Sequence, residues 1–349
     1  MNKKLTIISL TAVLILSPLF SKFINKAYAL ESYSTQKELR ISSTGTRSLH
    51  IRTPRNLGGA LTLQTWEKPD VLAKYEKLIK APDAQLAEKL AEMIDVDIEK
   101  HGYEVELSIK TPFRAPWEEE SYQVNLYLQL FVPEGFSLEF NTSNFNLEID
   151  GPLKQVDISS SNGTINVRQV KENTHIANSN GKIYVEDLSG EVDIETSNNP
   201  IHALRIDTKG KSAYLRNNNE EVRIEQFKGA LEVETSNAPI VARGLSLIDG
   251  DSRFENSNSE IELEIEELSS SELEVDNSFG DVSITLPKNS SFDLSFSVGS
   301  GGKIHTRNLL IQPKLIAKTM LIGVCGEGES AIEVFVNGVG EIELLGIEK

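Results

Sequence analysis

The chain has 349 residues, of which 52 are acidic and 35 basic, giving a formal net charge of −17, and 39% are hydrophobic. This hydrophobic content is enough for a packed core and excludes wholesale disorder. The acidic balance excludes a nucleic-acid-binding protein, which needs a basic surface to hold phosphates. We therefore expect a folded, acidic protein with no nucleic-acid partner.

The start of the chain has the features of an export signal. Two lysines at positions 3 and 4 precede an apolar stretch from Leu5 to Phe20, and Ala27-Tyr28-Ala29 is a small-x-small cleavage site. We predict a signal peptide over residues 1–29 and a mature protein that begins at Leu30. The long spacer before the cleavage site leaves an alternative open, in which the segment is kept as a membrane anchor.

Residues 30–135 are predicted to form N-terminal strands and one short helix. Leu49–Arg52 and Leu61–Trp66 are expected to be strands, and Pro82–Ile94 an amphipathic helix. A helix here would cap the open sheet edge at the start of a stack of strands. Its apolar stripe contains Leu86, Leu90, Met93 and Ile94.

Residues 136–290 contain an internal repeat, which is the strongest pattern in the sequence. Seven asparagines mark it, separated by steps of 18, 18, 18, 21, 18 and 21 residues. Apolar residues recur four and usually six positions before each asparagine, and three and five positions after it. This alternation predicts two short strands per unit, joined at a polar corner. The asparagines are Asn144, Asn162, Asn180, Asn198, Asn219, Asn237 and Asn258.

A unit of this length cannot bury its apolar face alone, so neighbouring units must stack. The predicted fold is therefore all-β, a single-stranded β-solenoid with coils of about 18 to 21 residues. Frequent Ile and Val and the period-two alternation oppose a helical repeat. The inward positions should form a buried column that includes Ile165, Ile183, Val222, Ile240 and Ile261.

The asparagines have a structural explanation. Asparagine tolerates the left-handed backbone region and can bond the neighbouring backbone, as a corner requires. Stacked amides can also form a hydrogen-bonded ladder along the molecule. The alternative is that the row of asparagine side chains binds a ligand. In two of these corners, Gly163 and Gly181 are expected to supply the next positive φ.

The repeat resembles a known family. Ile158–Val167 and Ile176–Val185 each contain an apolar strand, then Asn-Gly, one residue, Ile, one residue and Val. Leu126–Gly135 resembles the family's strand leading into a Val-Pro-x-Gly turn. These segments are similar to the bacterial DUF4097 repeats, often labelled putative adhesins. The resemblance implies an exported β-solenoid and brings no catalytic motif.

Residues 291–349 are predicted to form C-terminal strands and a cap, with strands in Phe292–Phe296 and Ala331–Leu345. Gly299–Gly302 is expected to be a loop. No Lys-Ser/Thr pair follows it, so we do not expect a phosphate-binding loop. Cys325 is the only cysteine and cannot pair within the chain. We expect it to be a small buried apolar residue rather than a reactive thiol.

No catalytic, cofactor-binding or metal site is predicted, and no cofactor. The five histidines lack metal-ligand spacing, and no Gly-x-Ser-x-Gly elbow occurs. One acidic strip is expected on the outer face of a strand as a solvated surface; weak calcium binding or a catalytic acid pair are the alternatives. The histidines are His50, His101, His175, His202 and His305, and the strip is Glu260, Glu262, Glu264 and Glu266.

The predicted function is a non-enzymatic binding or structural role in the cell envelope or at the surface, in the periplasm or outside the cell. The expected partner is an envelope or surface ligand, either a protein or a glycan. One alternative is a polysaccharide lyase or glycosidase of the parallel β-helix type. The other is a regulatory envelope subunit that docks a membrane partner, which a retained N-terminal segment would favour.

Overall fold

The computed structural model describes residues 5–6, 31–120 and 122–348. The predicted signal peptide and its cleavage site lie outside the described residues, apart from Leu5 and Thr6. The described residues form 26 strands and two short helices, and the protein is all-β, with 69% strand and 4% helix. Hydrogen bonding links these strands into one continuous, bent sheet.

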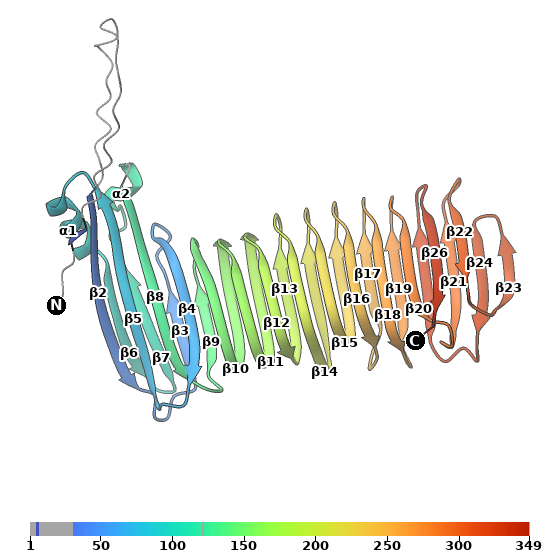
Figure 1. Cartoon of the computed structure of the whole chain (residues 1–349), viewed down its shortest axis with the longest axis horizontal. Coiled ribbons are helices and arrows are strands. Elements are labelled where there is room, and N and C mark those ends of the chain that lie inside the picture. The colour runs from blue at the N-terminus through green and yellow to red at the C-terminus, as the bar shows by residue number, and fades with distance from the viewer. Residues whose placement is uncertain (1–4, 7–30, 121, 349) are drawn as a thin grey trace, which may run out of the picture.

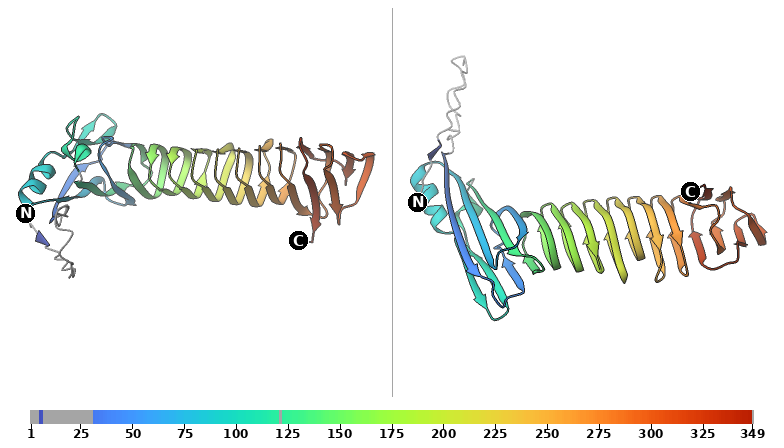
Figure 2. Two further views of the ribbon diagram at one scale, coloured as in Figure 1. Left: turned by 90° about the horizontal axis from the view of Figure 1, so that it is seen from above. Right: turned by 60° about the horizontal axis from the view of Figure 1, so that its bottom comes forward.

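The bent sheet forms two rows of strands that enclose a single core (Figures 1 and 2). Row A contains the strands that follow each repeat asparagine, and row B contains those that precede it. From β2 onward, row A has fourteen strands in the order β2-β5-β8-β4-β10-β11-β12-β14-β15-β16-β18-β20-β26-β22, and the two-residue β1 pairs with the outer edge of β2. Thirteen spacings of about 4.8 Å make this row about 60 Å long.

In the middle of the molecule each repeat unit adds one parallel strand to each row, in register with the unit before. Ile165 pairs with Ile183, Ile183 with Ile201, and so on along row A. The predicted inward column is confirmed, because its members are at most 1% exposed. The strands are β9 (Ser137–Asn141), β10 (Phe145–Asn162), β11 (Ile165–Asn180), β12 (Ile183–Ser189), β13 (Glu191–Thr196), β14 (Ile201–Asn217), β15 (Val222–Thr235), β16 (Ile240–Leu247), β17 (Ser252–Asn256), β18 (Ile261–Leu268), β19 (Glu272–Asn277) and β20 (Val282–Pro287).

The left-handed corner is not where the sequence predicted it. None of the seven asparagines has a positive φ; in five of the units a left-handed residue lies seven positions later, where row A turns toward row B. Gly163 has the expected positive φ of 110°, but Gly181 does not. Glycine is needed at position 181 because a Cβ there would lie 1.7 Å from the Gly163 carbonyl oxygen. The left-handed residues are Gln169, Asp187, Arg205, Gln226 and Gly244.

At the N-terminal end of the molecule, antiparallel strands and a helix lie beyond the regular stack. The unit β3–β4 lies between β9–β10 and β7–β8, although it comes earlier in the chain than both. Strands β5, β2 and β6 then extend the rows outward. The elements are β1 (Leu5–Thr6), β2 (Glu31–Ser42), β3 (Ser48–Arg52), β4 (Gly58–Trp66), β5 (Asp70–Ala81), α1 (Ala84–Glu92), β6 (Asp95–His101), β7 (Glu104–Lys110), α2 (Pro116–Glu119) and β8 (Gln123–Pro133).

Helix α1 lies within the predicted segment and packs against β5 and β2. The Asp83 side chain caps it by accepting a 2.8 Å hydrogen bond from the Leu86 N–H. Leu90 and Ile94 are buried, as predicted. Met93, the C-cap residue after the helix ends at Glu92, is 40% exposed, contrary to prediction.

At the C-terminal end, the last unit of the chain is again out of order. Strands β25 and β26 insert between the unit β19–β20 and the unit β21–β22. Beyond β21, row B continues into the antiparallel hairpin β24–β23, whereas row A ends at β22. The strands are β21 (Phe292–Val298), β22 (Lys303–Arg307), β23 (Ile311–Ala317), β24 (Met320–Cys325), β25 (Ala331–Val336) and β26 (Glu341–Ile347).

Candidate functional site

The seven repeat asparagines lie in one column at the corner between row B and row A. From Asn162 to Asn258, each side-chain Nδ2 donates to the Oδ1 of the preceding asparagine, over 2.9 to 3.3 Å. The same nitrogen also donates to a backbone carbonyl of the preceding corner, such as that of Ser143 for Asn162. Each amide group therefore directs its donors along the stack, which supports a structural role over ligand binding.

A second polar column lies two residues before the first and was not predicted. Asn217 is fully buried; its Nδ2 donates to the Asn199 carbonyl at 2.8 Å and its Oδ1 accepts from the Asn219 N–H. Asn256 and Asn277 make the same two bonds. Asn178 makes only the first, to the Gly163 carbonyl, and its Oδ1 has no partner among the described residues. The sequence carries the signal, because every unit from the third onward has Asn or Thr at this position. The column contains Asn178, Thr196, Asn217, Thr235, Asn256 and Asn277.

The acidic strip is shorter and more neutralised than predicted. Glu260 precedes β18 instead of lying in it. Arg243 of the neighbouring unit binds Glu262, with Nη2 and Oε1 2.7 Å apart, and Glu264 adds to the acidic field that raises the pKa of Arg243. The strip is thus part of a surface of mixed charge, with Glu266 also in contact with other groups.

The histidines are scattered, and four of them, His50, His101, His175 and His305, lie within 4 Å of a carboxylate. His50 Nδ1 lies 3.0 Å from Glu139, and His175 Nδ1 lies 3.0 Å from Asp193. In the described part of the chain no three His, Cys, Asp or Glu side chains are placed to hold a metal ion. Cys325 is buried, and burial raises the pKa of its thiol, which disfavours the reactive thiolate.

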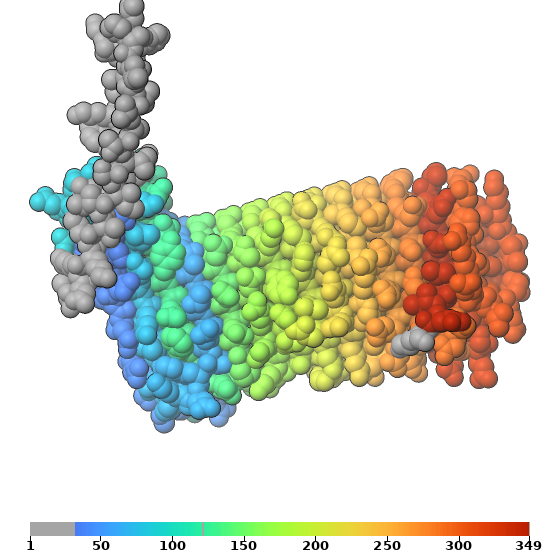
Figure 3. Space-filling model, in the orientation of Figure 1, coloured from blue at the N-terminus to red at the C-terminus, as the bar shows by residue number. Residues whose placement is uncertain are grey.

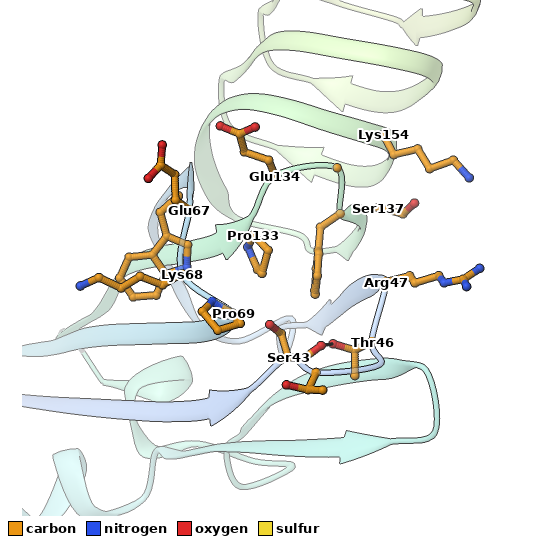
Figure 4. Close-up of a pocket in the computed structure, with 14 residues that line it drawn as sticks. Ser43, Thr46, Arg47, Glu67, Lys68, Pro69, Pro133, Glu134, Ser137 and Lys154 are labelled. Atoms are coloured by element: carbon orange, nitrogen blue, oxygen red, sulfur yellow. Dashed lines mark hydrogen bonds between the residues drawn. The ribbon is translucent and has the colours of Figure 1, made fainter.

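A cleft of about 550 Å³ opens at the N-terminal end, where three loops meet the stack (Figure 4). The loops are residues 43–47 before β3, 66–69 before β5 and 133–137 before β9. Backbone hydrogen bonds of 2.9 Å fix them to one another, from Ser43 to Pro69 and from Ser137 to Arg47. Gly135 has a φ of 74° in the turn after Pro133, so a glycine is suited to this position.

The cleft is lined by three cations, Arg47, Lys68 and Lys154, and two acids, Glu67 and Glu134, around an apolar floor. Arg47 and Lys154 point to one side of it, and Lys68 lies across from them beside Glu67 (Figure 4). Phe136 is buried in the floor. Lys154 is 3.6 Å from Glu172, whereas Arg47 forms no ion pair with any described residue. The Arg47–Lys154 side therefore presents positive charge on a protein that is strongly negative overall.

Trp66 forms one wall of the cleft and is held rigidly. Its ring stacks on Phe131 with 5.3 Å between centroids, and its Nε1 donates to the Asp70 carbonyl at 2.8 Å. The Lys68 ammonium lies 5.0 Å from the ring centroid, within the range of a cation–π contact. These contacts order the loop that carries Lys68. The arrangement suits recognition of an anionic group more than proton transfer, because the flanking cations favour bound negative charge.

No described helix is both long enough and apolar enough to cross a bilayer. No protein-family model matches the chain, and no curated protein matches it in sequence.

Several solved structures show some similarity. A putative cell adhesion protein from Clostridium sporogenes is 11% identical over 90% of this chain and all of its own length, with a TM-score of 0.27. A putative lipid binding protein from Parabacteroides distasonis is 12% identical, over 88% of this chain and 96% of its own, with a TM-score of 0.35. A putative adhesin from Parabacteroides merdae is 10% identical, over 89% and 95%, with a TM-score of 0.30. Similarity at this level assigns neither a family nor a function to the chain.

Proposed function

We propose that this protein is an exported, non-enzymatic β-solenoid of the cell envelope or surface that binds an acidic glycan at the cleft of Figure 4. The observation that carries the proposal is the continuous in-register stack, in which every unit from β9 to β20 repeats the same two strands. Such a stack supplies a rigid support that holds a binding site at one end.

Export is proposed from the sequence. The basic start, apolar stretch and small-x-small site form the pattern of a signal peptide. The lack of a disulfide framework is compatible with an exported fold because the long buried core and the two asparagine columns stabilise the stack without cross-links. Membership of the DUF4097 repeats is part of the same proposal and rests on the resemblance of the repeat units.

The ligand class follows from the cleft. An arginine fork pairs well with a carboxylate or phosphate group, and a lysine adds a second cation beside it. Arg47 and Lys154 provide that combination on one side, and Phe136 and the two prolines of the lining provide an apolar floor for a sugar ring. The Lys154–Glu172 pair is largely exposed, so a bound anion can replace it at little cost.

A binding assay with acidic and neutral polysaccharides tests this site. The Arg47→Ala/Lys154→Ala variant is expected to lose at least about tenfold in affinity for the acidic polysaccharide, since hydrogen bonds to charged groups contribute about 1.5–3 kcal/mol each. Lys171→Ala/Lys211→Ala removes two exposed cations elsewhere on the stack and should bind as the parent does. Equal binding by both variants would exclude the cleft as the site.

Two further measurements test the rest of the proposal. Fractionation and the mass of the mature N-terminus should show a chain that begins at Leu30; recovery of Met1 from the membrane fraction would favour an anchored regulatory subunit. Incubation with the bound polysaccharide should release no oligosaccharides. Release that stops in the Glu260→Gln/Glu262→Gln/Glu264→Gln/Glu266→Gln variant, with circular dichroism unchanged, would favour the lyase or glycosidase alternative.

A further inference from the structure

The C-terminal end of the molecule, formed by β22, β23 and β24, differs from the rest of its surface. Row B extends two strands beyond row A here, so the hairpin β24–β23 has no facing strand (Figure 1). The outermost strand, β23, pairs on one side only, with β24. We call residues 303–322 the C-terminal tip; Figure 3 shows it as the flat end of the molecule.

Large apolar side chains are exposed on the tip. Leu310 is 89% exposed, Ile316 72%, Leu315 44% and Met320 37%. Ile316 pairs with Leu321 and Leu315 with Ile322, so the hairpin is apolar on both faces. An isolated exposed leucine is ordinary, but Leu315, Ile316 and Met320 lie together at the turn of the hairpin, and a group of exposed apolar side chains marks a contact surface.

The charge of the tip is opposite to that of the rest of the chain. Residues 294–326 contain no acid and four cations, Lys303, Arg307, Lys314 and Lys318, whereas the whole chain carries −17. Three of these cations pair with acids on the neighbouring strands β26 and β21, at exposed sites where ion pairs are weak. Lys318 lies in the hairpin turn, next to Met320, and is exposed.

The edge of the tip is unsuited to pairing with a second copy of the chain. Pro313 in β23 has no N–H to donate to an added strand, and Lys314 beside it is a charge on the edge. Two tips meeting end to end would also bring their lysines together. The apolar and cationic surface instead complements an anionic lipid surface, which accepts both kinds of side chain at once.

We propose that the C-terminal tip docks on an anionic bilayer. Leu315, Ile316 and Met320 enter the boundary between headgroups and acyl chains, while Lys314 and Lys318 remain at the level of the lipid phosphates. Each lysine near the surface contributes about a fivefold gain in binding, which salt weakens. The stack then holds the cleft of Figure 4 at the far end, about 60 Å from the bilayer.

Co-sedimentation with vesicles tests the proposal, using the protein with the N-terminus that it carries when isolated from cells. Wild type should bind vesicles of phosphatidylglycerol and phosphatidylcholine, bind pure phosphatidylcholine at least about fivefold less, and detach as salt rises. Leu315→Ser/Ile316→Ser should weaken binding by at least about tenfold, and Lys318→Glu by about fivefold or more. The matched control Tyr103→Ser/Phe113→Ser replaces two residues that are 73% and 95% exposed at the N-terminal end and should bind as wild type.

A fluorescence measurement distinguishes insertion of the tip into the bilayer from binding of the vesicle by another part of the chain. Ile316→Trp should show a blue shift and quenching by brominated lipid in phosphatidylglycerol vesicles. Phe279→Trp, at a site of similar exposure, should show neither. Unchanged vesicle binding by the serine and glutamate tip variants, or an unquenched Trp at position 316, would overturn the proposal. If wild type binds no vesicles but self-associates, and the tip variants do not self-associate, the partner of the tip is a second copy of the chain rather than a bilayer.

Discussion

The two ends of the stack differ in how their outermost strands are covered. At the N-terminal end, helix α1 lies against β2 and β5 and buries Leu90 and Ile94. Beneath its C-terminus the buried Lys77 ammonium donates to the carbonyls of Ala91 and Ile94. At the C-terminal end, neither of the two described helices covers the outermost strand, and Ile316 is 72% exposed.

This difference shows that a stack of strands can end by burial or by surface chemistry. Covering an end stabilises it, because apolar area leaves the water and helix carbonyls find a partner. Ending on a proline and lysines stabilises little, but it blocks the addition of another strand and leaves apolar side chains available to a partner. One end therefore adds stability, whereas the other remains open for contact.

The largest effect should come from the covered end. Leu90→Ala is expected to lower the free energy of unfolding by about 2–5 kcal/mol, because a fully buried leucine leaves a cavity. Met93→Ala, on the same helix but 40% exposed, should cost less than about 0.5 kcal/mol. Hydrogen exchange should place the loss in peptides from β2, β5 and α1, since each unit contacts only its neighbours. An equal cost for both variants would mean that α1 does not seal this end.

A smaller effect is expected in the middle, which both ends enclose. Asn217→Ala should lower the free energy of unfolding by about 1–3 kcal/mol, because it removes a fully buried amide that bonds the Asn199 carbonyl and the Asn219 N–H. Asn219→Ala removes three bonds of the exposed column, where water can replace the lost partners, and should cost about 1 kcal/mol or less. Urea unfolding of the two variants makes the comparison; the reverse order would assign the main structural role to the exposed column.

The next effect, the change with pH in the free energy of unfolding that Lys77 contributes at the covered end, is expected to be smaller than the two above. Burial lowers the pKa of the Lys77 ammonium, with Lys37 acting in the same direction and Asp95 and Glu92 opposing it. Between that lowered value and the unfolded value of about 10.4, the unfolded chain binds more protons, so stability rises with pH. The stability of wild type relative to Lys77→Met should therefore increase as pH rises toward about 10.4. A stability difference between wild type and Lys77→Met that does not change with pH would contradict this expectation.

The smallest effect should come from the open end. Ile316→Ala is expected to change the free energy of unfolding by less than about 0.5 kcal/mol in either direction, because the side chain is mostly in solvent. Ile332→Ala, in the buried core of the same end, should cost about 0.5–3 kcal/mol or more. Thermal unfolding of both variants is sufficient, and a large loss at position 316 would show that the tip is structural.

Periodic features were predictable from the sequence because each repeat unit carries the same pattern of apolar and polar residues. The inward column from Ile165 to Ile261 and the helix around Leu90 follow from apolar spacing alone. The left-handed corner was not predictable, because Gln169, Asp187 and Arg205 share a backbone conformation but no side-chain type. The loops of the cleft have no period at all, and their association depends on backbone bonds between segments far apart in the chain.

The late position of β25 and β26 in the chain has a consequence for biosynthesis. Among the described strands, β22 pairs with β26 alone, and β25 joins β19 to β21, so a unit synthesised after β21–β24 completes an interior layer. Residues 291–325 can therefore pair with one another as they emerge, but they cannot join the stack until the final strands arrive. A chain that stops before Ala331 would keep all of its regular units and lose the connection between them and its last hairpin.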